Sequence, residues 1–240
     1  MPAPRIAVVI PTWNELGNAV ELVQQIFALG LDVAVWVMDD GSTDGTLEAL
    51  DLIAAEHKHL HVVRRSGARG YGRACVDGLQ RALDSGAELI LQMDGDLSHE
   101  PRYIPPMVAA AASADLVVGS RYVRGISVVN WSLKRLLLST FANHYVRALA
   151  GLTPRDCTTG FRLWRRELLT RVHLGDIRSE GYSFLVEALF RASQEGARIT
   201  EVPIIFIERK LGESKMSTQV LVESMWLPWR LAARRLLARL

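Results

Sequence analysis

Short apolar segments alternate with helical patterns along the first half of the chain. Runs rich in β-branched and aliphatic residues, which are typical of buried strands, lie at 6–11, 33–38, 61–64, 89–93 and 115–119. Between them, apolar residues recur at helical spacing over 18–29, 47–56 and 73–85. Strands that alternate with helices form βαβ units, so the pattern predicts an α/β fold with a mostly parallel sheet flanked by helices.

The second half of the chain is less regular. The spacing predicts a long amphipathic helix over 131–149, a loop over 156–162, a helix over 180–191 and a strand over 199–206 that Pro203 interrupts. Two stripes run along the long helix, an apolar one with Leu137, Leu138, Phe141, Tyr145 and Ala148 and a polar one with Ser132, Arg135, Ser139 and Asn143. We expect one catalytic domain over 1–220 and an amphipathic C-terminal helix over 221–240.

Composition places the chain among folded globular proteins. Of its 240 residues, 49% are hydrophobic and 22% are charged, a balance that excludes a disordered chain. The formal net charge is only +2, which gives no reason to expect a nucleic-acid partner. Cys75 and Cys157 are too few for a disulfide framework, which favours a reducing compartment. Because no run of about 18 uncharged apolar residues is present, we expect no transmembrane helix, and either a soluble protein or a peripheral protein at the cytoplasmic face of a membrane.

Two predicted strands end abruptly in acidic residues. The run at 89–93 leads into Asp94-Gly95-Asp96, and the run at 33–38 leads into Asp39-Asp40. The carboxyl ends of parallel strands meet at one edge of the sheet, where open α/β sheets bind ligands. Carboxylates held close together repel unless a cation neutralises them, and hard cations prefer oxygen ligands and substrate phosphates. The pattern favours a divalent cation (Mg²⁺ or Mn²⁺) at Asp94 and Asp96, with a solvated turn as the structural alternative.

Asp40 has two interpretations. It can accept hydrogen bonds from a ribose or a base, or it can cap the following helix. Ser42, Thr43 and Asp44 are equally able to cap that helix, which favours a binding role for Asp40.

Other catalytic patterns are missing from the sequence. The glycine-rich stretch at 67–72 matches neither G-x-G-x-x-G nor a P-loop, which argues against a Rossmann dehydrogenase or a P-loop enzyme. The six histidines are scattered over predicted surfaces, and no Ser-His-Asp arrangement can be defended among them.

Three motifs occur in the order and spacing of one enzyme class. They are Val-Ile-Pro-Thr-Trp-Asn-Glu at 9–15, Met-Asp-Asp-Gly-Ser-Thr-Asp-Gly-Thr at 38–46 and Met-Asp-Gly-Asp-Leu-Ser-His at 93–99. Together they resemble family-2 glycosyltransferases of GT-A fold. Further segments narrow the resemblance to polyprenol (dolichol) monophosphate mannose synthases. They lie at 119–122, 156–162, 180–184 and 202–204, together with Arg209, Gly212, Ser214 and Lys215. This resemblance covers nearly the whole chain and implies metal-dependent, inverting transfer of mannose from GDP-mannose to a polyprenyl monophosphate.

The resemblance also assigns roles to individual residues. Donor binding is assigned to Pro11, Trp13, Glu15, Asp40, Asp94, Gly95, Asp96, Arg209 and Lys215. Acceptor-phosphate binding is assigned to Arg121, Arg135 and Ser139, and the metal to Asp94, Asp96 and Ser98. The expected catalytic group is Asp94, Asp96, Arg121, Arg135 and Ser139.

Two positions depart from the family pattern. Trp13 replaces the usual tyrosine but keeps an aromatic plane that can stack on a base. Ser98 stands where glutamine is common, and its shorter arm suits a bridging water better than direct metal ligation.

The expected chemistry explains why arginines accompany the acids. A polyprenyl phosphate is already anionic at neutral pH, so it is a competent nucleophile without a strong general base. The site must orient the reactants, screen phosphate–phosphate repulsion and stabilise the leaving diphosphate. A metal ion together with arginines that contact phosphate in a bidentate manner supplies those functions.

The C-terminal segment predicts a contact with a surface. Trp229, Ala233, Leu236 and Leu240 share one helical face, and arginines flank it. This pattern is typical of a helix lying on an anionic membrane, although the same face could pack on the catalytic domain. A membrane-anchoring partner subunit is a further way to meet a lipid acceptor.

Two other functions stay open. A UDP-glucose-dependent polyprenyl-phosphate glycosyltransferase shares the first three motifs. A non-catalytic lipid- or nucleotide-binding subunit is disfavoured, because it need not keep all of Asp94, Asp96, Arg121, Arg135, Arg209 and Lys215.

Overall fold

One large sheet forms the centre of the molecule. The computed structural model describes residues 5–177, 179–208 and 218–237. Within these ranges, seven strands pair in the order β3-β2-β1-β4-β7-β5-β8. Their bounds are β1 Ile6–Thr12, β2 Val33–Asp39, β3 Leu60–Arg64, β4 Leu89–Gln92, β5 Leu116–Ser120, β7 Arg162–Arg165 and β8 Ile199–Pro203. All pairings in this sheet are parallel except those of β7, which runs antiparallel to both β4 and β5.

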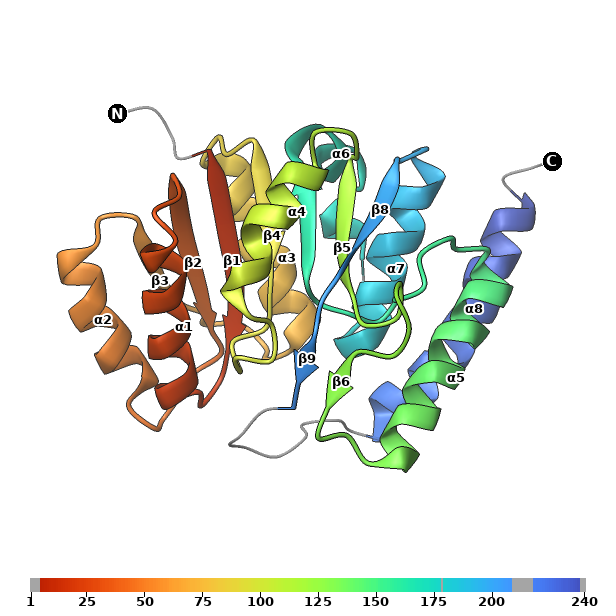
Figure 1. The fold of residues 1–240 in the computed structure, drawn as a ribbon, viewed down its shortest axis with the longest axis horizontal. Coiled ribbons are helices and arrows are strands. Elements are labelled where there is room, and N and C mark those ends of the chain that lie inside the picture. The colour runs from red at the N-terminus through yellow and green to blue at the C-terminus, as the bar shows by residue number, and fades with distance from the viewer. Residues whose placement is uncertain (1–4, 178, 209–217, 238–240) are drawn as a thin grey trace.

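Helices cover both faces of the sheet (Figure 1). One face carries α1 (Leu16–Ala28), α2 (Thr46–Glu56) and α4 (Ile104–Ala110). The other carries α3 (Tyr71–Asp84), α6 (Arg166–Arg171) and α7 (Gly181–Gln194), with α5 (Leu133–Ala150) and α8 (Thr218–Leu237) side by side at the edge of this layer. The short elements are the 3₁₀ turns η1 (Pro101–Tyr103) and η2 (Leu174–Asp176), and the parallel pair β6 (Val128–Val129) and β9 (Phe206–Ile207).

Alternation along the strands divides the core into two clusters. In β1, Ile6, Val8 and Ile10 pack toward α1, whereas Ala7 and Val9 pack toward α3. Because successive side chains of a strand point to opposite faces, a strand covered on both sides must be apolar at every position. This explains why the buried strands are visible in the sequence as continuous apolar runs.

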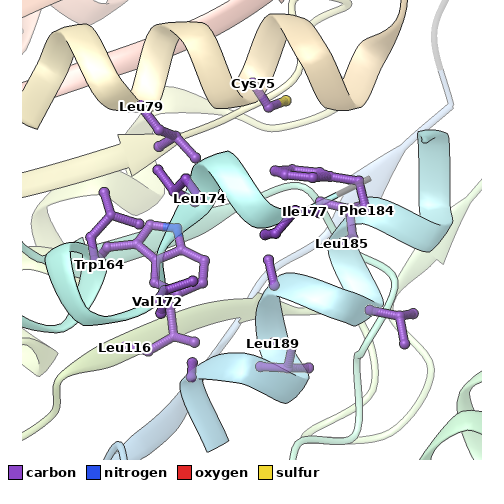
Figure 2. Packing of buried hydrophobic residues seen from close by; sticks show 14 of the residues in the cluster. Cys75, Leu79, Leu116, Trp164, Val172, Leu174, Ile177, Phe184, Leu185 and Leu189 are labelled. Atoms are coloured by element: carbon purple, nitrogen blue, oxygen red, sulfur yellow. The ribbon is translucent and has the colours of Figure 1, made fainter. Parts of the chain in front are cut away.

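The cluster on the second face joins the last strands to the helices. Figure 2 shows Trp164 of β7 and Leu116 of β5 meeting Leu79 of α3 and the side chains around α7. All four elements contribute to one buried cluster, so the less regular second half of the chain is part of the same core as the first half.

Most of the predicted elements are confirmed. The α/β class, the mostly parallel sheet and the helix at 180–191 are present, and Pro203 ends β8 as expected. Strand β7 was not predicted, because only Leu163 and Trp164 separate the arginines at its two ends. Arg162 is nevertheless fully buried, and its guanidinium donates to the carbonyl oxygens of Leu185 and Cys157.

The long helix α5 has an unexpected orientation. Its apolar stripe lies in solvent, with Leu137 61% and Phe141 66% exposed. The residues that face the domain are Asn143, Val146 and Ala150. Tyr145 is the exception in this stripe, because it packs against the core and its hydroxyl donates to the Met225 carbonyl of α8 at 2.7 Å. Most of the stripe that looked like a packing face is therefore exposed.

Helix α8 also has one side buried against the domain and another side exposed. Leu227 and Leu231 are buried against the domain, whereas Trp226, Trp229 and Leu236 are exposed. The helix begins at Thr218 and so crosses the expected boundary between 220 and 221. None of the helices in the described ranges combines the length and apolar character that are needed to cross a bilayer.

The topology places a switch point beside β1. The chain passes from β1 to β2 through α1 on one face, and reaches β4 through α3 on the other. Loops after β1 and β4 therefore diverge and leave a crevice at the carboxyl ends of the strands, where such sheets bind ligands. The Asp40 amide donates to the carbonyl of Thr12 at 3.0 Å and joins the loops after β1 and β2.

Candidate active site

A cleft of about 420 Å³ lies at this edge of the sheet. Its lining includes the expected residues Pro11, Trp13, Glu15, Asp40, Asp94, Gly95, Asp96, Arg121 and Arg135. Ser98 and Ser139 lie outside the lining, and Arg209 and Lys215 fall outside the described residues. Residues that were not anticipated from the sequence also line it, among them Arg69, Tyr71, His99, Gly160 and Phe206.

The loops after β1 and β2 hold each other in place. Asn14 has a left-handed backbone (φ 52°), and its side-chain oxygen accepts from the Thr43 amide at 2.8 Å. The Asn14 amide donates to Ser42 Oγ at the same distance. Asp39 is fully buried and accepts from the amides of Gly41 and Ser42, both at 2.9 Å. Asp39 therefore fixes the turn, and its neighbour Asp40 is the carboxylate that reaches the cleft.

Asp40 lies at the junction with the glycine-rich stretch. One of its oxygens pairs with Arg65, and the other accepts from the Gly70 amide at 3.0 Å. The guanidinium of Arg69, in the same stretch, lies 5.2 Å from the centre of the Trp13 ring. A cation over an aromatic face is attracted by the ring quadrupole, so Trp13 and Arg69 form one wall of the cleft.

The acidic turn after β4 is strained and tightly bonded. Leu97 adopts φ 61°, which is unfavourable for a bulky side chain and is found mainly where surrounding structure enforces it. The Ser98 hydroxyl donates to Asp96 Oδ1, and the Ser98 amide donates to the same oxygen at 3.1 Å. Ser98 is buried and orients the Asp96 carboxylate, and its own place at the metal stays a prediction.

Half-buried Tyr71 and buried His99 support Asp94. The Tyr71 hydroxyl donates to Asp94 Oδ1 at 2.7 Å. The Asp94 amide donates to His99 Nδ1 at 3.1 Å, and the His99 ring stacks on Phe161. Burial lowers the pKa of His99 despite the nearby carboxylates, so the ring stays neutral and Nδ1 can accept. The expectation that the histidines are surface residues is thus wrong for His99.

The donor set in the cleft fits a hard divalent cation. Among the described residues, no group of three or more His, Cys, Asp and Glu side chains is placed to hold a metal ion. Asp94 and Asp96 both line the cleft, so they offer carboxylate oxygens while the rest of a coordination shell must come from other sources. Mg²⁺ commonly binds in this manner, through one or two carboxylates together with substrate phosphates and water.

Arg121 lies at the other end of the cleft in a buried ion pair. Its Nε and Nη2 each donate to Asp156 at 2.6 Å, and Nη2 also donates to Thr158 at 2.9 Å. Burial pushes the pKa of Asp156 upward, but the charge and hydrogen bonds of Arg121 outweigh it and leave the pKa lowered. The rings of Tyr122, Trp131 and Phe206 surround the guanidinium at 5.4–5.5 Å.

Helix α5 supplies the remaining basic group. Arg135 pairs with Glu208 and lies 4.4 Å from the centre of the Trp131 ring. Ser139 accepts from the Tyr122 hydroxyl at 2.8 Å. Asn143 accepts from the Cys157 amide at 2.7 Å, which ties α5 to the loop that bears Asp156. The polar stripe predicted on this helix therefore faces the domain.

A family model described as glycosyl transferase family 2 matches residues 7–172. The chain belongs to this family. It is 39% identical to an undecaprenyl-phosphate mannosyltransferase of Micrococcus luteus over 232 residues, which are 96% of each protein. It is 40% identical to a polyprenol monophosphomannose synthase of Mycolicibacterium smegmatis over 227 residues, covering 94% of this chain and 86% of the relative.

Solved structures show the fold of this glycosyltransferase. A glucosyl-3-phosphoglycerate synthase from Mycobacterium tuberculosis, in complex with Mn²⁺, UDP and phosphoglyceric acid, superposes with a TM-score of 0.64 at 21% identity, covering 93% of this chain and 78% of that one. A mannosyltransferase from Pyrobaculum calidifontis, in complex with GDP-Man and Mn²⁺, gives 0.58 at 19% identity, covering 99% and 76%. At these identities the likeness concerns the fold, and it confirms the expected GT-A architecture.

Proposed function

We propose that this glycosyltransferase transfers mannose from GDP-mannose to a polyprenyl monophosphate with inversion at the sugar. The observation that carries the proposal is that one cleft brings the Asp94–Asp96 turn and the basic residues Arg121 and Arg135 together. Two relatives of similar length, near 40% identity, bear names that describe mannosyl transfer to polyprenyl phosphates.

The reaction is a single displacement. An oxygen of the lipid phosphate attacks C1 of mannose, the bond from C1 to the diphosphate oxygen breaks, and GDP leaves with the electron pair. Because the nucleophile is already an anion, the cleft must chiefly align the two phosphorylated reactants and offset their mutual repulsion. A bound Mg²⁺ or Mn²⁺ would screen the diphosphate, with Asp94 and Asp96 as its protein ligands.

The donor half of the cleft suits a nucleotide. Trp13 presents an aromatic plane for the base, and Pro11, Glu15 and Asp40 lie beside it. Gly95 keeps the acidic turn close to the β1 backbone, since a Cβ there would lie 3.3 Å from the Pro11 carbonyl oxygen. Arg209 and Lys215 stay proposed contacts of the donor diphosphate.

The acceptor half suits a phosphate that arrives from a lipid surface. Arg121 and Arg135 line this end of the cleft, and Ser139 lies on the same helix as Arg135. The exposed apolar residues Phe141 and Trp229 are on α5 and α8, the two helices at this side of the molecule (Figure 1). We propose that these helices lie on the membrane that contains the acceptor, and the two free, buried cysteines favour its cytoplasmic face.

The decisive experiment measures sugar transfer. Labelled GDP-mannose and UDP-glucose would be supplied in parallel with a polyprenyl phosphate in detergent micelles, each with Mn²⁺ or with EDTA. Mannose transfer that requires the metal is the expected result. Transfer from UDP-glucose would overturn the donor assignment, and transfer that persists in EDTA would overturn the metal. Nucleotide binding without any transfer would reject catalysis by this chain alone and favour a binding subunit or the need for a membrane partner.

A further inference from the structure

The Tyr71 hydroxyl connects the first turn of α3 to the acidic turn. It donates to Asp94 Oδ1 at 2.7 Å and accepts from the Gln92 side-chain amide at 3.2 Å. The Tyr71 ring meets Phe184 of α7 edge to face, with the ring centres 6.4 Å apart. The hydroxyl thus both donates and accepts a hydrogen bond, and its ring packs against an aromatic side chain of α7.

A glycine from another element closes over this hydrogen bond. A Cβ at Gly160 would lie 2.4 Å from the Tyr71 hydroxyl and 2.7 Å from Asp94 Oδ1, and real Cβ atoms do not approach that closely. The backbone of the loop before β7 therefore lies directly against both atoms. Only glycine, which has no Cβ, allows this approach. The Tyr71–Asp94 hydrogen bond therefore depends on glycine at position 160.

The hydrogen bond leaves the two oxygens of Asp94 in different situations. Oδ1 accepts the hydrogen bond of the Tyr71 hydroxyl, which engages that oxygen on the side of α3. Among the described residues, Oδ2 accepts no hydrogen bond, and His99 Nδ1 lies 3.7 Å from it. Because Nδ1 accepts from the Asp94 amide, it offers no proton to Oδ2.

We infer that Tyr71 is a positioning residue, which fixes the Asp94 carboxylate so that Oδ2 is presented to a divalent cation and the donor diphosphate. This inference rests on the proposed function, which supplies the ligand. Groups that orient a metal-binding carboxylate typically contribute about 10- to 100-fold to metal affinity. Tyr71 would act through Asp94 and need not touch the substrate.

The test is Mn²⁺ binding by the Tyr71→Phe variant. Calorimetric titration of Mn²⁺ into protein saturated with GDP should show about 10- to 100-fold weaker binding than in the wild type. The transfer assay should show the same shift in half-saturating Mn²⁺, with the maximal rate largely recovered at high Mn²⁺. A residue with only a structural role would instead lower the melting temperature and the maximal rate together.

Two further variants make the result specific. Tyr103→Phe also removes a tyrosine hydroxyl that accepts a hydrogen bond, here from the Ile205 amide at 2.9 Å, but lies outside the cleft lining and should leave Mn²⁺ binding unchanged. Gly160→Ala should also weaken Mn²⁺ binding, because its Cβ would displace both the Tyr71 hydroxyl and Asp94 Oδ1. Unchanged binding in Tyr71→Phe, or an equal loss in Tyr103→Phe, would overturn the inference. Mn²⁺ and GDP binding do not depend on the sugar or the acceptor, so failure of the proposed transfer would be recognised separately.

Discussion

The donor half of the cleft and the α5–α8 pair distribute their polar and apolar groups in opposite ways. Around the donor half, apolar strands are buried and the carboxylates of Asp40, Asp94 and Asp96 reach the cleft. In the α5–α8 region, Phe141 and Trp229 lie in solvent, whereas the carboxylate of Glu187 on α7 is only 2% exposed. One region is organised to bind a polar ligand, and the other exposes the kind of surface that most folded domains cover.

The difference shows how a helix can be attached while its apolar face stays free. Glu187 accepts from Ser179 at 2.6 Å and pairs with Arg191 of its own helix at 3.1 Å. Arg230 and Arg234 of α8 reach the same carboxylate, each at 3.6 Å. Helix α8 is thus held by Leu227, Leu231 and a buried charge cluster, and the opposite side remains available to another apolar environment.

The donor half should respond to mutation through catalysis and not through stability. Asp96→Ala removes a carboxylate that lines the cleft, and the several kcal/mol supplied by a bound metal correspond to a loss of about 10³-fold in turnover. The melting temperature should change little, because Asp96 contributes no core packing. Turnover and circular dichroism melts would be measured together. Wild-type turnover at limiting Mn²⁺ would contradict the assignment of Asp96 to the metal.

The α5–α8 region should respond to Glu187→Gln in the opposite manner. The substitution leaves the three arginines without their buried counter-charge, and breaking a buried ion pair costs about 3–5 kcal/mol. Urea unfolding would measure the loss. Glu195→Gln removes a carboxylate from an exposed pair with Arg171 and should cost less than about 1 kcal/mol. Equal stability of the two variants would show that Glu187 does not hold α8.

The same contrast explains what could be predicted from the sequence. The strands of the donor half are buried on both faces and end in acids, so their pattern gave both the fold and the position of Asp94 and Asp96. Tyr71 was missed because its contact to Asp94 is made from another segment of the chain. His99 lies in the motif itself, but the sequence does not show that its ring is buried and accepts from the Asp94 amide. The sequence feature that pointed toward Tyr71 was the glycine-rich stretch at 67–72 that contains it, but this stretch matched no phosphate-binding motif.

Prediction was weaker in the second half, for a physical reason. Periodicity shows that a helix has an apolar face, but not what covers that face, and the stripe on α5 proved to be exposed. Strand β7 was obscured because Arg162 is buried and donates to two backbone carbonyl oxygens, an arrangement that residue type alone does not suggest.

Arg135 lies on α5 and also lines the cleft, where the two regions meet. Its loss should therefore change the KM for the acceptor and not the KM for the donor. Arg135→Ala would remove the proposed charge-assisted contact to the lipid phosphate, and such contacts are worth about 1.5–3 kcal/mol, or about 10- to 100-fold in the acceptor KM. The donor KM should stay the same. Lys134→Ala, which removes an exposed charge from the preceding position outside the cleft lining, is the matched control. If the donor KM rose and the acceptor KM did not, Arg135 would belong to the donor half.

The smallest effect is expected from the exposed apolar residues, and it should concern membrane binding alone. Phe141→Ser and Trp229→Ser each remove an exposed apolar side chain from the α5–α8 surface. Partial burial of such a side chain in the membrane interface is worth about 1.4 kcal/mol. Each substitution should therefore weaken binding to vesicles of anionic phospholipid about tenfold. Unfolding should be unaffected, since both side chains are exposed. Leu52, 73% exposed on α2 at the far side of the molecule (Figure 1), provides the control Leu52→Ser. Vesicle sedimentation would measure all three variants. An equal loss in Leu52→Ser would mean that general hydrophobicity, and not a defined face, determines membrane binding.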